Sequence, residues 1–133
     1  MPEGRNTPRR YVVLEHEVGP DPGSGEVHYD LCLEDGDVLI TFQLDGPPST
    51  TQIVTGRRSF DHRPHYLSYE GELTRERGRV RAWDRGLADD LSGEPRAERY
   101  TFRCREGRLA GQWSLDAPPG EGSPVRCAPL EVT

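Results

Sequence analysis

The chain has 133 residues and no lysine, because all 17 of its basic residues are arginine. A Walker-type phosphate loop needs a lysine that reaches the phosphates, and a Schiff-base enzyme needs a lysine amine. A ligase or capping enzyme that attaches a nucleotide to lysine needs the same side chain. The absence of lysine therefore excludes all three kinds of active site.

Cysteines and long apolar runs are also scarce. The three cysteines, Cys32, Cys104 and Cys127, form no CxxC pair and no disulfide framework, which argues against structural zinc and a disulfide-rich fold. No apolar run exceeds four residues, so we expect no signal peptide and no membrane span. We expect a cytoplasmic protein with reduced thiols.

The composition and the charge distribution narrow the function classes. With 15 glycines, 12 prolines and 32% hydrophobic residues, a helical bundle is not expected. The net charge of −6 argues against a protein that coats nucleic acid non-specifically. Nine acids and no arginine lie between residues 11 and 54, whereas residues 55–85 contain eight arginines and five acids. This asymmetry suits a metal site beside a phosphate-contacting rim, but a mixed solvated surface gives the same counts.

Alternating apolar and polar residues predict two β-hairpins. The first joins residues 27–34 to 38–44 through Asp35-Gly36, and the second joins residues 100–104 to 108–115. Further strands are expected at residues 11–14, 52–55, 66–71, 78–83 and 125–132. Short strands separated by Gly/Pro turns predict a barrel or a sandwich. Residues 1–10 are expected to form a flexible arm, and residues 11–133 a single domain.

A candidate metal site begins with His28 and Asp30. Residues at i and i+2 of a strand project from one face, with Cα atoms about 6.5–7 Å apart, so both side chains can reach one ion. Tyr29 and Leu31 then face a core. His16, at the end of the first strand, is the candidate third ligand, and two imidazoles with one carboxylate suit Mn, Fe or Zn. A polar strand face on an exposed sheet would show the same pattern.

A second cluster of titratable groups lies at residues 61–66, which read Asp-His-Arg-Pro-His-Tyr. A histidine can transfer a proton, a tyrosine can orient an oxyanion and an arginine can hold a phosphate. Only one of His62 and His65 needs to be functional. The alternative is a polar loop that leads into a strand at Pro64.

Several motifs occur in the same order as in the 3′-phosphoesterase domain of bacterial ATP-dependent DNA ligase D, which this chain resembles. They are a strand ending in His16, the His28-Tyr29-Asp30 strand, Asp61-His62 with Tyr66, Tyr69-Glu70-Gly71, Trp83-Asp84-Arg85-Gly86, and the Gly107–Trp113 hairpin. The match extends from about Tyr11 to Leu115. Together with the strand pattern, it predicts an all-β fold, namely a small closed or partly open β-barrel of about seven or eight short, mainly antiparallel strands.

The resemblance implies a manganese-dependent phosphoesterase that removes a 3′-terminal ribonucleoside and then a 3′-phosphate before end joining. His16, His28 and Asp30 would be the ligands of Mn²⁺ or of another divalent ion such as Zn²⁺. His62 would contact the scissile phosphate or act as general acid, and Tyr66 would assist it. Nucleic-acid 3′ ends would be the substrate, a separate ligase or end-joining proteins would be partners, and no membrane would be involved.

Two positions depart from the family pattern and weaken its phosphate clamp. Cys32 stands where the family has arginine, and Leu14 stands where it has glutamine. The spacing of twelve residues between His16 and His28 is also longer than in the family. Four arginines are candidates to bind phosphate instead: Arg57, Arg58, Arg63 and Arg85. The alternative function is a catalytically inactive module that binds nucleic acid or a repair protein, and a metal-binding barrel of different chemistry is a third reading.

Overall fold

The computed structural model describes residues 7–23 and 25–130. Its strands are β1 (Arg9–Glu17), β2 (Val27–Asp35), β3 (Val38–Leu44), β4 (Val54–Arg58), β5 (Gly71–Glu72), β6 (Arg79–Ser92), β7 (Arg99–Cys104), β8 (Gly111–Asp116) and β9 (Pro124–Pro129). One 3₁₀ helix, η1 (Pro64–Leu67), joins β4 to β5. Within these two ranges no helix is long and apolar enough to cross a membrane.

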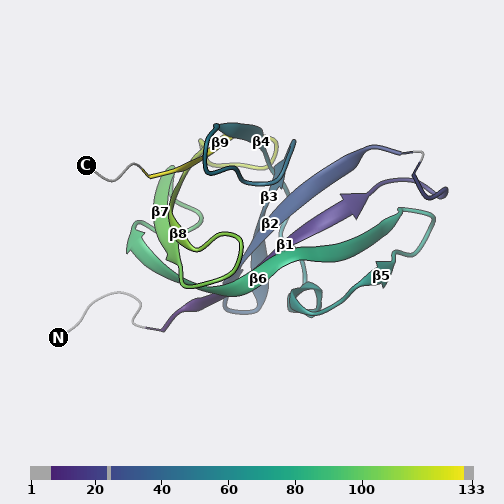
Figure 1. Cartoon of the computed structure of the whole chain (residues 1–133), viewed down its shortest axis with the longest axis horizontal. Coiled ribbons are helices and arrows are strands. Elements are labelled where there is room, and N and C mark those ends of the chain that lie inside the picture. The colour runs from purple at the N-terminus through teal and green to yellow at the C-terminus, as the bar shows by residue number, and fades with distance from the viewer. Residues whose placement is uncertain (1–6, 24, 131–133) are drawn as a thin grey trace.

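The sheet closes on itself and forms a barrel, as predicted. The strand order is β1-β2-β3-β4-β9-β8-β7-β6-β5, and an additional pairing of β1 with β6 completes a ring of eight strands (Figure 1). All of these pairings are antiparallel. The long strands β1, β2 and β6 extend beyond the barrel on the side that carries β5. Both predicted hairpins are present, as β2–β3 and β7–β8.

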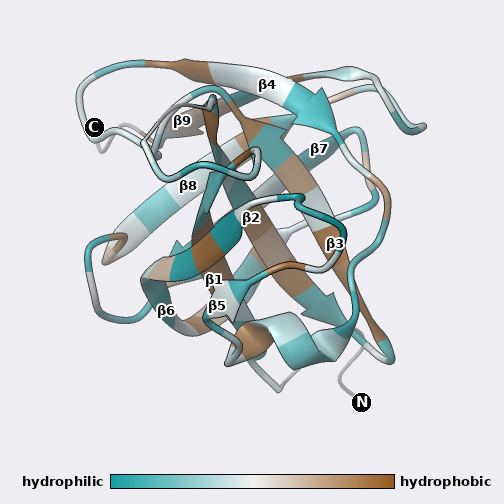
Figure 2. Cartoon of the chain, turned by 90° about the vertical axis from the view of Figure 1, so that its right-hand side faces the viewer, coloured by the Kyte–Doolittle hydropathy of each residue, from teal (hydrophilic) through white to brown (hydrophobic). Residues whose placement is uncertain are grey.

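The barrel interior holds the main apolar core. Alternation along β2 directs Tyr29, Leu31 and Leu33 inward, as the sequence predicts. The largest fully buried side chains of this core are Trp113, Tyr11, Tyr100, Phe42 and Phe102. Hydrophobic segments of the strands meet inside the barrel in Figure 2. Burial of each large apolar side chain contributes roughly 1.5–3 kcal/mol, so this cluster supplies most of the fold's stability.

A second apolar cluster lies on the outer face of β1 and β2. Alternation along β1 sends Tyr11 and Val13 into the barrel, and Val12 and Leu14 to the opposite face. The buried members of this outer cluster are Val12, Leu14, Cys32, Leu39 and Val80. Tyr66, Leu67, Tyr69 and Leu73, from η1 and the residues after it, pack against them. The segment from 59 to 78 therefore covers one outer face of the barrel, and we call it the covering segment. The candidate functional site lies between this segment and the barrel.

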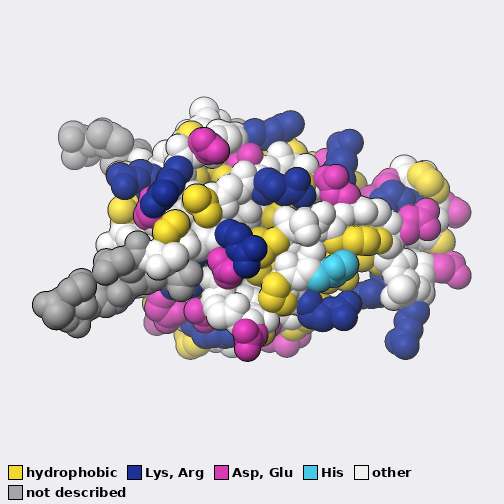
Figure 3. All heavy atoms as spheres, turned by 90° about the horizontal axis from the view of Figure 1, so that it is seen from below, with side chains coloured by type: hydrophobic (Ala, Val, Ile, Leu, Met, Phe, Trp, Pro, Cys, Tyr) yellow, Lys and Arg dark blue, Asp and Glu magenta, His cyan; other side chains and the backbone are white. Residues whose placement is uncertain are grey.

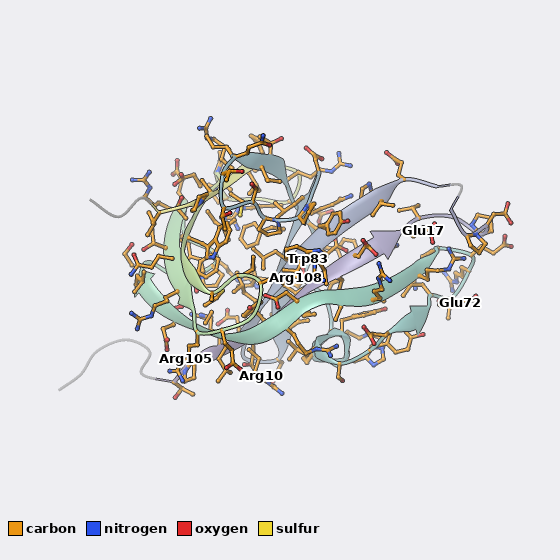
Figure 4. All side chains as sticks on the ribbon, in the orientation of Figure 1. Arg10, Glu17, Glu72, Trp83, Arg105 and Arg108 are labelled. Atoms are coloured by element: carbon orange, nitrogen blue, oxygen red, sulfur yellow. The ribbon has the colours of Figure 1, made fainter. Side chains whose placement is uncertain are left out.

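The Trp83–Gly86 motif has a structural role in this fold. The Trp83 ring packs against the barrel core, and the Arg108 guanidinium lies 4.8 Å from its centre (Figure 4). The Asp84 carboxylate accepts hydrogen bonds from the Tyr11 hydroxyl at 2.8 Å and from the Leu109 amide at 3.1 Å. The motif thus attaches the β7–β8 hairpin loop to β1 and β6.

Some predicted boundaries are wrong for identifiable reasons. The strand expected at residues 66–71 is η1 followed by a turn, because Pro64 starts a helical turn and Tyr66 packs onto the outer cluster. Arg9 and Arg10, which we assigned to the flexible arm, belong to β1. Arg9 is buried, and its Nε donates to Asp90 at 2.9 Å. Residues 1–6 of the expected arm lie outside the described residues.

Candidate functional site

One cavity of about 610 Å³ contains every side chain predicted to bind metal or to catalyse. His16, His28, Asp30, His62 and Tyr66 all line it. The cavity lies between the outer face of β1 and β2 and the covering segment. On the face shown in Figure 3, a histidine reaches the surface beside arginine side chains.

The paired strands β1 and β2 place three of these side chains on one face. His16 lies directly opposite His28, and Leu14 lies opposite Asp30 in the antiparallel register. The ring centroids of His16 and His28 are 6.1 Å apart. At position 78 the chain passes so close to β1 that only glycine fits, because a Cβ there would lie 1.8 Å from the Glu17 carbonyl oxygen. The covering segment can therefore approach β1 closely enough to bring Arg77 to His16.

Asp30 is the centre of the site. Its carboxylate is nearly buried, and its Oδ2 atom lies 3.7 Å from His16 Nδ1 and 3.9 Å from His62 Nε2. The pKa of His16 is raised, mainly by the interaction with Asp30. Burial of His16 lowers this pKa, and the hydrogen bond to the Arg77 carbonyl raises it further. The His16 Nε2–H donates to that carbonyl at 3.0 Å. The site therefore favours the protonated form of His16.

His28 is held by a residue that we did not predict. The Gln43 side-chain amide lies 2.6 Å from His28 Nδ1, and Arg57 Nε donates to the Gln43 carbonyl oxygen at 3.4 Å. His28 Nε2 lies 3.9 Å from the carboxylate of the exposed Glu26. Gln43 could have been found from the predicted hairpin, since the turn at Asp35-Gly36 places Gln43 opposite Asp30.

His62 is fixed by its backbone and its ring. Its amide donates to the Leu39 carbonyl at 2.8 Å, and the Leu39 amide donates to the His62 carbonyl at the same distance. The ring Nδ1–H donates to the Phe60 carbonyl at 3.0 Å, so the other nitrogen, Nε2, faces Asp30. Tyr66 packs edge-on against the ring, and Phe60 stacks on it.

The donor types suit a divalent transition metal, but the side chains are not drawn together around one point. Donors that share an ion at about 2.0–2.2 Å lie only about 3–3.5 Å from each other, whereas Asp30 is 3.7 Å from His16 and 3.9 Å from His62. Among the described residues, no group of three His, Cys, Asp or Glu side chains is already placed to hold an ion. Metal binding by His16, His28 and Asp30 stays a prediction.

Arg58 is not a phosphate-binding residue, in contrast to our prediction. Its side chain is buried, and burial lowers the pKa of its guanidinium. The guanidinium also stacks over the Phe42 ring at 5.1 Å. Its hydrogen bonds go to the backbone carbonyls of Pro95, Ala97, Ala117 and Pro118. Arg58 therefore joins two loops at one end of the barrel and has no donor facing the cavity.

The other three arginines occupy different places. Arg63 lines the cavity, whereas Arg57 is bonded to Gln43 and Arg85 is exposed on β6 away from the cavity lining. Arg77 lines the cavity although the sequence did not single it out. Its guanidinium donates to the carbonyl and the hydroxyl of Thr74, both at 3.0 Å.

The two altered family positions add no charge to the site. Cys32 is fully buried in the outer cluster, with its sulfur 3.6 Å from the Thr41 hydroxyl, and burial raises the pKa of its thiol. Leu14 forms part of the apolar wall of the cavity. The cations that line the cavity, Arg63 and Arg77, both belong to the covering segment.

Comparison with known proteins gives no relative from which a function could be transferred. No protein-family model matches the chain, and no curated protein matches it at a significant level.

Proposed function

We propose that this chain is a metal-dependent phosphoesterase that acts on 3′ ends of nucleic acids, similar to the 3′-end-processing domain of DNA ligase D. The observation that carries the proposal is the shared cavity. His16, His28, Asp30, His62 and Tyr66 come from three segments, namely β1, β2 and the residues between β4 and β5, yet all line the same space of about 610 Å³. Each of these residues was selected from sequence motifs, independently of the fold.

His62 is the proton donor in this proposal. Hydrolysis breaks the bond between phosphorus and the leaving oxygen, while water adds to phosphorus and releases a proton to solvent. His62, with a proton on both ring nitrogens, delivers its Nε2 proton to the leaving oxygen. The bond from Nδ1–H to the Phe60 carbonyl supports this role, because it fixes the ring with Nε2 toward the cavity. Arg63 lines the same cavity and contacts the non-bridging phosphate oxygens.

The metal in this proposal is Mn²⁺ or Zn²⁺, held by His16, His28 and Asp30. A bound divalent ion would neutralise phosphate oxygens and activate water. His16 offers Nδ1 on the Asp30 side. Gln43 contacts Nδ1 of His28, so Nε2, which lies 3.9 Å from the exposed Glu26 carboxylate, is the nitrogen of His28 left to bind a metal. Nearby apolar groups such as Leu14 and Val80 strengthen these charge interactions by excluding water.

One observation favours a second function, a catalytically inactive module that binds nucleic acid or a repair protein. Cys32 occupies the position of the family's arginine and is sealed in the outer cluster, so it cannot contact a substrate. Loss of one charged clamp costs about 10²–10³ in rate where it stabilises a transition state. A module without turnover would retain the barrel and the cavity.

The test is turnover of a duplex primer that ends in a 3′-ribonucleoside or a 3′-phosphate, with Mn²⁺, with Zn²⁺ and with EDTA. We expect release of nucleoside or phosphate only with a metal, and a fall in kcat of about 10²–10⁴ in His62→Gln. His65→Gln is the matched control, because His65 is exposed, packs on Tyr66 and Tyr69, and does not line the cavity.

Equal loss in His62→Gln and His65→Gln would contradict the role of His62. Absence of turnover with every metal would refute the enzymatic proposal, and a gel shift retained by both variants would then support the binding module.

A further inference from the structure

Phe60 is the most exposed large apolar side chain in the described residues. Its side chain is 59% exposed, although complete burial of a phenylalanine is worth roughly 1.5–3 kcal/mol. Phe60 also lines the candidate catalytic cavity. An aromatic ring held at the entrance of a site is an indication of a ligand that covers it.

The backbone keeps Phe60 in this position. On one side, the Ser59 amide donates to the Thr41 carbonyl at 3.0 Å, and on the other side His62 and Leu39 exchange two hydrogen bonds of 2.8 Å. The Phe60 carbonyl additionally accepts from the His62 ring. Turning Phe60 into the barrel would break these bonds along β3, so the exposed ring is preorganised.

The Phe60 ring borders two separate spaces. Its contact with the cavity side is the His62 imidazole, which stacks on it with centroids 4.9 Å apart and planes inclined by 23°. A second hollow, of about 320 Å³, is lined by Phe60, Asp61 and Arg96 but not by His62. Phe60 therefore stands between the cavity that contains His62 and a hollow with room for a planar group.

We propose that Phe60 is a stacking platform for the terminal nucleobase of the substrate. The inference rests on the proposed function and specifies its substrate class, namely 3′ ends that still carry a base. A nucleotide carries its base one sugar away from its phosphate, and the hollow beside Phe60 adjoins the cavity that contains His62, because Phe60 lines both. Stacking is tolerant of sequence because every base has a π-face, so Phe60 would select for the presence of a base and not for its identity.

The experiment measures binding without turnover. A duplex primer with 2-aminopurine as its 3′-terminal base and a 3′-phosphate is titrated with protein in EDTA, and again in Mg²⁺. Stacking quenches 2-aminopurine fluorescence, so we expect quenching with the natural chain and with Phe60→Tyr, which keeps the ring. Phe60→Ala should lose the quenching and raise Kd about 5- to 150-fold, which corresponds to the 1–3 kcal/mol of a base–aromatic stack.

A primer with an abasic 3′-phosphate terminus provides the second arm, and its Kd should be the same for Phe60→Ala and the natural chain. Melting temperatures of the variants should match, since the ring is largely exposed. Unchanged quenching in Phe60→Ala, an equal loss of affinity for the abasic primer, or no binding by the natural chain would overturn the inference. Failure of the proposed enzyme would look different, because quenching would persist while no metal supports turnover.

Discussion

Replacing Asp30 with asparagine tests the electrostatics at the centre of the site. The substitution keeps the shape of the side chain and removes its charge. In the natural chain Asp30 Oδ2 lies 3.7 Å from His16 Nδ1, and both side chains are mostly buried. We expect Asp30→Asn to lower the pKa of His16, because the interaction with Asp30 is the main cause that raises it.

The expected magnitude follows from this geometry. With an effective dielectric constant of about 20, two unit charges 3.7 Å apart attract by about 4.5 kcal/mol. Desolvation of the buried carboxylate offsets most of this attraction. A net loss of about 1–2 kcal/mol in the free energy of unfolding remains, which corresponds to a fall of about 4–7 °C in Tm for a domain of this size.

The loss should depend on pH in one direction. His16 has a pKa raised above the ordinary histidine value of about 6.5. The stabilisation is therefore fully present below that value and disappears as the pH rises through the raised pKa. Urea unfolding in EDTA should show the full difference between the two chains at about pH 5.5 and little difference at about pH 9. NMR titration of the His16 ring measures the same shift directly.

Glu26→Gln is the matched control for Asp30→Asn. The Glu26 carboxylate lies 3.9 Å from His28 Nε2, but its side chain is 80% exposed. Solvent screens such a pair, so we expect a change within about 0.5 kcal/mol at every pH. A destabilisation in Asp30→Asn that is equal at both ends of the pH range would refute the pairing of Asp30 with a protonated His16.

Two further predictions concern residues that hold parts of the molecule in place. Arg58→Met should destabilise the chain by about 3 kcal/mol or more in urea unfolding, because it leaves several loop carbonyls without their donor. Arg57→Met, on the same strand, is the control and should change the free energy of unfolding by no more than about 1 kcal/mol. Equal effects of the two substitutions would contradict a structural role for Arg58. Gln43→Leu removes the partner of His28 Nδ1 and should weaken Zn²⁺ binding about 10- to 100-fold in calorimetry, and unchanged affinity would show that Gln43 does not orient His28.

The barrel was predictable because its strands obey local rules. On β2 a strict alternation separates Tyr29 and Leu31, which enter the core, from His28 and Asp30, which face the cavity. The turn between β2 and β3 was predictable from the Asp35-Gly36 dipeptide. Gly36 has a φ of 62° there, a conformation that favours glycine. The ring closure between β1 and β6 has no local signature, because it joins residues about seventy positions apart.

The site was only partly predictable, because motifs identify residue types and not their surroundings. His62 and Tyr66 were selected by spacing, whereas the choice of Arg58 failed because burial depends on loops far along the chain. A strand was predicted at residues 66–71, but packing of Tyr66 on the outer cluster places it in the helical turn Pro64–Leu67. Tertiary packing overrode local propensity at both places.

Cys32 stands on β2 where the 3′-phosphoesterase domain that the sequence resembles has arginine. Position 32 is covered by the segment from 59 to 78 and does not line the cavity, so a side chain there does not contact an anion in the cavity. Arg77 is held by Thr74 and uses its carbonyl to orient His16. Arg63 lines the cavity and donates no side-chain hydrogen bond to the described residues. Within the proposed function, Arg63 is therefore the cation whose place and freedom fit it to replace the missing clamp.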